Sequence, residues 1–203
     1  MRVRLLTVCL VLMFVPRLGV AQDFGVTESA ETVDRGNVKI KASPIIIFGK
    51  GAEDDGRGVA LAAGYGFTDR FDAEAMVALY DGVTIFGGNA EFWLVKGRKV
   101  DVSFSPGIHV RGGDQTLDQT GLDLTFIASG RSSTRLELYG AFDVAVERLG
   151  DNLPASFNYT TLHLVPGFEY RIAKDIDLDG EFGIALNDDS RHYASAGLTF
   201  YFR

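Results

Sequence analysis

The chain has very little cysteine: Cys9, in the first apolar stretch, is the only one among 203 residues. The remainder therefore cannot hold a disulfide scaffold or a thiolate metal motif. Basic residues are also in the minority, with 20 Lys and Arg against 27 Asp and Glu, for a net charge of −7. Because phosphate binding requires a basic surface, this balance excludes a nucleic-acid partner. A hydrophobic content of 46% excludes intrinsic disorder.

The first 21 residues have the three parts of a secretory signal peptide. Arg2 and Arg4 give a positive start, residues 5–15 form an apolar run, and small residues precede a predicted cleavage after Ala21. The run is shorter than the roughly 20 residues that a membrane-spanning helix needs. We therefore expect an exported chain whose mature form contains no cysteine.

From Val38 onward, apolar and polar residues alternate over windows of about ten residues. Residues 100–111 are the clearest case, because every second side chain is apolar and the residues between include Asp101, His109 and Arg111. A helix, with a period of 3.6, would mix these two faces, so the alternation predicts β-strands. The ten expected strands are Val38–Phe48, Gly58–Phe67, Phe71–Tyr80, Thr84–Val95, Val100–Arg111, Thr120–Ser129, Thr134–Glu147, Thr160–Ile172, Ile176–Leu186 and Arg191–Phe202.

The connections between these strands differ on the two sides of the predicted sheet. Those after even-numbered strands have three or four residues, whereas those after odd-numbered strands include the long segments Gly49–Arg57 and Arg148–Tyr159. Short turns on one side and longer loops on the other are typical of outer-membrane barrels. Lipid offers no partner to free backbone groups, so a spanning sheet must close on itself. A soluble β-sandwich would show the same alternation and is the alternative.

We therefore predict an all-β protein that forms a closed, antiparallel, up-and-down transmembrane β-barrel of ten strands, with eight as the alternative count. The barrel domain comprises residues 38–203, and residues 22–37 form a polar N-terminal tail without any period. Three prolines lie inside expected strands, at Pro44, Pro106 and Pro166. Because proline cannot donate to a ladder, we expect β-bulges at these positions.

The aromatic residues of the apolar phase gather near the short turns, as in the aromatic girdle of a membrane interface. A girdle favours the membrane barrel over the sandwich, although aromatic residues also favour strands in general. The members of this group are Tyr65, Phe67, Phe71, Phe92, Tyr170, Phe200 and Phe202.

The last residues of the chain resemble the C-terminal assembly signal of bacterial outer-membrane β-barrels. Ser195, Gly197, Phe200 and Phe202 match it in order, whereas Arg203 follows the final aromatic residue that usually ends the signal. The resemblance implies a location in the cell outer membrane, with outer-membrane lipid and lipopolysaccharide as surroundings. It also implies insertion by the barrel-assembly machinery with periplasmic chaperones. The oligomeric state stays open.

The polar face of the strands carries charged residues in the strand interior as well as at the ends. In a closed barrel this face lines the lumen, and Arg171 and Asp177 are expected to face each other across one tight turn. The interpretations are a salt-bridged plug, which we favour, and a passage that favours cations because acids are in excess. The expected lumen charge cluster consists of Lys39, Lys41, Asp101, Arg135, Glu137, Glu169, Arg171, Asp177, Asp179 and Glu181.

Ten strands enclose little space, since porin channels use about 16 strands or more. We therefore predict a structural barrel or a narrow passage for small solutes or cations. The alternative is surface recognition through Gly49–Arg57 and Arg148–Tyr159. A barrel hydrolase is least favoured: His109 shares its phase with nearby acids, an arrangement that is more often structural, and His192 and Ser195 fall on opposite faces of a strand. We predict no enzymatic activity, no cofactor and no metal site.

Overall fold

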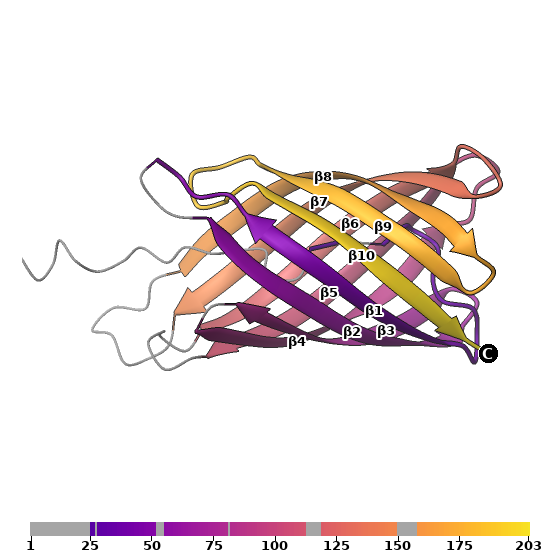
Figure 1. Cartoon of the computed structure of the whole chain (residues 1–203), viewed down its shortest axis with the longest axis horizontal. Helices are drawn as coiled ribbons and strands as arrows, with labels where there is room; N and C mark the ends of the chain where they lie inside the picture. Colours follow the sequence, from indigo (N-terminus) through magenta and orange to yellow (C-terminus); the bar gives the residue numbers. More distant parts are fainter. Residues whose placement is uncertain (1–24, 27, 52–54, 81, 113–118, 150–157) are drawn as a thin grey trace, which may run out of the picture.

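The protein is a closed β-barrel of ten strands in the computed structural model, which describes residues 25–26, 28–51, 55–80, 82–112, 119–149 and 158–203 (Figure 1). All ten predicted strands are present, and their ends lie within two residues of the predicted ones. The strands are β1 (Val38–Ile47), β2 (Gly56–Thr68), β3 (Phe71–Tyr80), β4 (Val83–Val95), β5 (Asp101–Gly112), β6 (Gln119–Arg131), β7 (Leu136–Leu149), β8 (Asn158–Ala173), β9 (Ile176–Ala185) and β10 (Tyr193–Phe202).

Every strand pairs antiparallel with its neighbours in the sequence, and β1 pairs with β10 to close the barrel. The fold class and the count of ten strands are thereby confirmed, and the sandwich is excluded. We call the end that holds Val38 and Arg203 the turn end, because its connections have only two to five residues. The opposite loop end has connections of up to eight residues. Among the described residues, no helix is long and apolar enough to cross a membrane.

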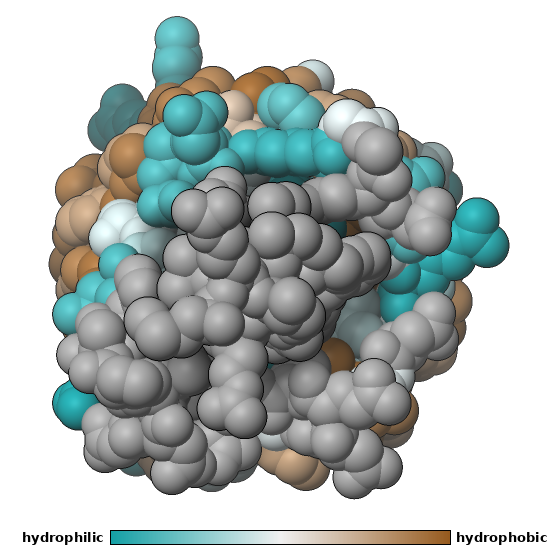
Figure 2. Space-filling view, turned by 90° about the vertical axis from the view of Figure 1, so that its left-hand side faces the viewer, coloured by the Kyte–Doolittle hydropathy of each residue, from teal (hydrophilic) through white to brown (hydrophobic). Residues whose placement is uncertain are grey.

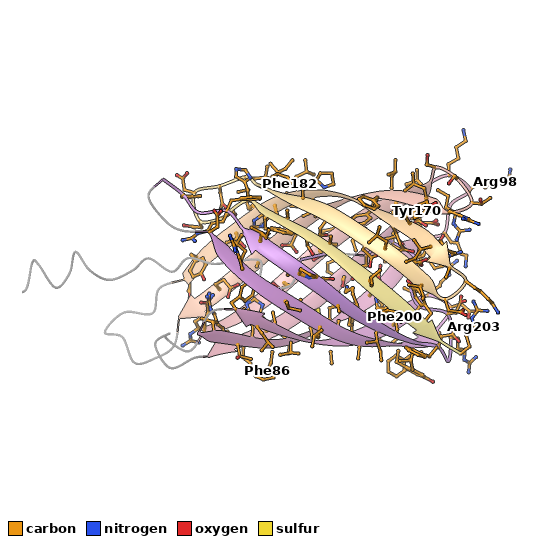
Figure 3. All side chains as sticks on the ribbon, in the orientation of Figure 1. Phe86, Arg98, Tyr170, Phe182, Phe200 and Arg203 are labelled. Atoms are coloured by element: carbon orange, nitrogen blue, oxygen red, sulfur yellow. The ribbon has the colours of Figure 1, made fainter. Side chains whose placement is uncertain are left out.

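The outer surface is apolar, as expected from the alternation. Viewed from the loop end, hydrophobic residues cover the circumference and hydrophilic ones lie at the rim (Figure 2). Near the turn end the rings of Tyr65, Phe67, Phe71 and Phe92 form a continuous chain, with centroids 4.9, 5.4 and 4.9 Å apart. Tyr170 and Phe200 lie on the outer surface towards the same end (Figure 3). The predicted aromatic cluster at this rim is therefore confirmed.

The prediction of bulges at the three prolines is wrong. Pro44, Pro106 and Pro166 each pair with one neighbouring strand, and on the other side the ladder skips them and resumes in the same register. The missing N–H removes a hydrogen bond on one side without adding a residue, so the alternation keeps its phase. The register shifts lie instead at residues 66–68, 93–95 and 171–173, all close to the turn end.

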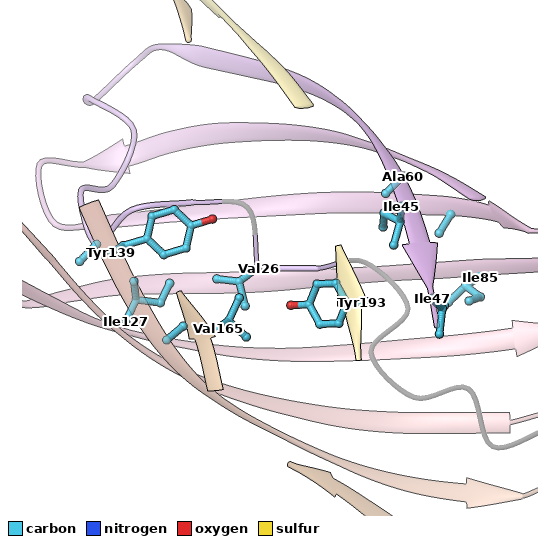
Figure 4. Close-up of a cluster of buried hydrophobic side chains, with 12 residues drawn as sticks. Val26, Ile45, Ile47, Ala60, Ile85, Ile127, Tyr139, Val165 and Tyr193 are labelled. Atoms are coloured by element: carbon cyan, nitrogen blue, oxygen red, sulfur yellow. The ribbon is translucent and has the colours of Figure 1, made fainter. Parts of the chain in front are cut away.

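The interior also holds an apolar cluster, which the sequence did not indicate (Figure 4). Ile45, Ile47 and Ile85 are fully buried inside the wall towards the loop end, while Val165 and Tyr193 lie on the β8–β10 side. Val26, which precedes the first strand, packs within the same cluster. The lumen is thus filled by apolar side chains in part and by charged groups elsewhere.

Candidate functional site in the barrel lumen

Most of the predicted lumen charge cluster does face the interior. Asp101 and Glu169 are half-buried, and Arg171 is half-exposed at the rim, with its Nε 3.4 Å from an oxygen of Asp177 as predicted. Arg135 precedes β7 and is exposed at the turn end, where it lines a small hollow together with Glu137, Glu169 and Arg171. The buried members are Lys39, Lys41, Glu137, Asp177, Asp179 and Glu181.

The described residues shortly before β1, residues 26 and 28–33, lie inside the barrel. The backbone N–H of Val26 donates to Glu181 Oε1 over 3.0 Å, and that of Ala30 donates to Ser129 Oγ over 3.1 Å. The N–H of Val33 donates to Asp72 over 2.6 Å. These acceptors stand on β9, β6 and β3, so three well-separated parts of the wall hold the segment in the lumen. We call residues 26–34 the luminal segment; residue 27 lies outside the described part of it.

Ion pairs add to these hydrogen bonds at the turn end. Lys39 Nζ lies 2.8 Å from Glu28 in the luminal segment and 3.1 Å from Glu74 on β3. All three side chains are almost completely buried, so this is a network of desolvated charges that depend on one another. Glu31 pairs with Arg131 at the more exposed rim, 2.5 Å apart.

Glycine on the inner face allows the Lys39–Glu74 contact to form across an intervening strand. Lys39, Gly64 and Glu74 are register partners on β1, β2 and β3. A Cβ at Gly64 would collide with the Lys39 side chain, which passes over this position. The small inward residue of β2 at this position therefore makes space for a larger neighbour. The same three-strand rows recur as His109–Gly121–Glu147 and Tyr139–Gly167–Glu181.

The row on β5, β6 and β7 brings a histidine together with two acids in the half of the lumen nearer the loop end. His109 Nδ1 lies 2.8 Å from Asp123 Oδ2, and His109 Nε2 lies 2.9 Å from Glu147 Oε1. Gln119 Nε2 also donates to Glu147 Oε2 over 2.8 Å. The expectation that His109 lies near an acid is confirmed. The alternation of the sequence did not show that His109 contacts two acidic residues. The second contact depends on the space that Gly121 leaves between His109 and Glu147.

The other histidines show no comparable arrangement among the described residues. His163 Nε2 faces the backbone oxygen of Arg191 at 2.9 Å, and its ring packs against Tyr193. His192 is exposed whereas Ser195 is buried, so they lie on opposite faces as predicted. Both long connections proposed for surface recognition lie partly outside the described residues.

The described residues enclose two larger hollows that adjoin the lumen. At the turn end, a cavity of about 250 Å³ lies between the luminal segment and the wall, with Glu28, Lys41 and Glu169 in its lining. A recess of about 620 Å³ lies where β4 and β5 lose their pairing beside Pro106. Its lining combines the inward His109 with the outward Phe86, so it adjoins both faces of the wall.

No protein-family model matches this chain, and no curated protein sequence matches it. Solved structures do: an outer membrane channel from Pseudomonas putida F1 has a TM-score of 0.51 at 9% identity, over 90% of this chain and 100% of that one. A bacterial polysaccharide outer membrane secretin also reaches 0.51, at 12% identity, over 84% of this chain and 67% of that one. The KdgM porin has a TM-score of 0.47 at 10% identity, with 81% and 99% covered. The fold is that of outer-membrane β-barrel proteins.

Proposed function

We propose that this protein resides in the bacterial outer membrane and forms a narrow, cation-favouring passage for small solutes, restricted by its own luminal segment. The observation that carries the proposal is the charge of the interior: among the described residues, ten buried acidic residues accompany only four buried Lys or Arg residues. An excess of fixed negative charge lowers the energy of a cation in a narrow lumen and raises that of an anion.

The way in which the luminal segment is held supports a restricting role. Its backbone N–H groups bond to side chains of the wall, at Glu181, Ser129 and Asp72, rather than entering a ladder. In the described part of the chain, backbone–backbone hydrogen bonds to the wall begin after this segment, through Gly36 N–H to Gly66 O and Gly66 N–H to Asn37 O. The segment can therefore move out of the lumen without breaking the sheet, because each strand of the barrel pairs with its two neighbouring strands.

The proposal includes the surroundings that such a barrel requires. The apolar circumference fits outer-membrane lipid, and the resemblance of Ser195, Gly197, Phe200 and Phe202 to an assembly signal supports insertion by the barrel-assembly machinery. Ser195 and Gly197 are buried on β10, whereas Phe200 and Phe202 are exposed on its outer face. Such a pattern leaves both aromatic side chains accessible from outside the sheet.

Selectivity measurements in planar bilayers test the passage. Under a salt gradient, we expect a small conductance whose reversal potential indicates preference for K⁺ over Cl⁻. Replacing Asp177→Asn, Asp179→Asn and Glu181→Gln removes three buried charges from one strand and should abolish most of this preference. The control variant, with Asp69, Asp188 and Asp189 changed to Asn, removes three exposed charges and should keep it. Correctly folded protein that never conducts would contradict the proposal and leave a structural barrel.

A further inference from the structure

The triad of His109, Asp123 and Glu147 has the donor chemistry of a metal centre. One ligand atom from each residue can be chosen so that all three lie within 4.8 Å of one another. Ligand atoms around a tetrahedral Zn²⁺ ion, each at about 2.0–2.2 Å, are about 3.5 Å apart, so the three groups must approach one another by about 1 Å to enclose an ion. One imidazole nitrogen with two carboxylates suits Zn²⁺ better than Mg²⁺ or Ca²⁺, which prefer oxygen alone.

The triad is built into rigid parts of the wall. His109 and Glu147 are buried on β5 and β7, and each is the register partner of Gly121 on β6. A Cβ at Gly121 would collide with the imidazole and with a Glu147 oxygen, so the glycine creates the space in which they meet. Gln119 holds Glu147 from the other side. Ligands supported in this way keep their positions before an ion arrives.

The triad is also open on one side. The Asp123 side chain is 25% exposed, whereas those of His109 and Glu147 are 2% and 0% exposed. An ion can therefore enter from the side of Asp123 and find two buried ligands beyond it. A water molecule can complete the coordination there, as in zinc sites with three protein ligands.

We propose that His109, Asp123 and Glu147 bind one divalent transition-metal ion, with Zn²⁺ as the representative, in the half of the lumen nearer the loop end. In the metal-free triad both ring nitrogens face carboxylate oxygens. Binding replaces one of these contacts by a metal–nitrogen bond, and the hydrogen on that nitrogen passes to solvent. The carboxylate of the other contact then turns from its ring nitrogen to the ion, so that all three residues are ligands. This site is independent of whether the lumen conducts.

Calorimetric titration of the refolded, untagged mature protein with ZnCl₂ tests the site. We expect one saturable site of micromolar affinity in wild type, and no such site for MgCl₂ or CaCl₂. Glu147→Gln and His109→Gln should each weaken Zn²⁺ binding roughly tenfold or more, because a lost ligand costs at least as much as a lost supporting group. The matched control is His163→Gln, which changes another buried inward histidine whose Nε2 faces a backbone oxygen; its affinity should be unchanged.

A second measurement protects the test against variants that fold poorly. Each variant is first checked for the difference in gel mobility between heated and unheated protein. Co²⁺ is then added to wild type, where visible absorption bands should show nitrogen and oxygen ligation without sulfur. Absence of saturable Zn²⁺ binding by folded wild type, or equal weakening by His163→Gln, would overturn the proposal. So would full affinity in folded Glu147→Gln.

Discussion

Deletion of residues 25–33 from the mature chain should raise the unit conductance in planar bilayers roughly tenfold or more, because it removes the backbone and side chains that occupy the lumen between the strands. The deletion removes the backbone N–H groups that donate to Glu181, Ser129 and Asp72. It also removes Glu28, which forms an ion pair with Lys39. It leaves Asp34 to Asn37, which lead into β1. Single-channel recording of both proteins under the same salt measures the change.

A smaller change separates occlusion from charge. Glu31→Gln keeps the luminal segment and weakens its pair with Arg131, an exposed contact of modest energy. Its conductance should stay close to wild type, since the lumen remains filled. If the deletion variant folds, as shown by its heat-dependent gel mobility, and conducts no better than wild type, the luminal segment is not what restricts the passage.

Gly167→Ala should prevent or strongly destabilise barrel formation. The added methyl group would overlap the ring of Tyr139, which passes over Gly167 and donates from its hydroxyl to Glu181 Oε2 over 3.0 Å. Overpacking of this kind costs about 1–3 kcal/mol, and loss of the buried hydrogen bond adds about 1 kcal/mol. The midpoint of urea unfolding in detergent, followed by gel mobility, measures the loss.

The chain offers a matched control for this substitution. Gly140 lies one residue along β7 from Tyr139 and faces outward, and no heavy atom lies within 4 Å of the place where its Cβ would be. Gly140→Ala should therefore leave the midpoint unchanged or raise it slightly, because alanine lowers the entropy of the unfolded chain. If the two variants lowered the midpoint of unfolding equally, the effect of Gly167→Ala would be that of any glycine substitution in a strand. It would then not depend on the Tyr139 ring that passes over Gly167.

The strands could be predicted from the sequence because the two environments of a barrel wall, lipid and lumen, each impose one phase of the alternation. The prolines were misinterpreted because alternation cannot distinguish a bulge from a gap in one ladder. The exposure of Arg135 could not be predicted, because alternation does not show that the strand begins only at Leu136. The luminal segment could not be predicted, since its contacts are scattered over three distant strands and leave no period. Glu28 and Glu31 find lysine and arginine partners that only the closed barrel brings near.

The inward glycines also determine how the strands can be staggered. A strand shifted by two residues against its neighbour still presents its apolar side chains to lipid. The hydrophobic pattern alone therefore does not distinguish the shifted register from the native one. Such a shift would pair Tyr139 with Val165 or Glu169 in place of Gly167. The side chain at that position would then block the Tyr139 ring from passing over β8 to Glu181. Stagger and strand number together fix the diameter of a cylinder. By fixing the register of the strands, a few inward glycines thus help to set the diameter of this barrel.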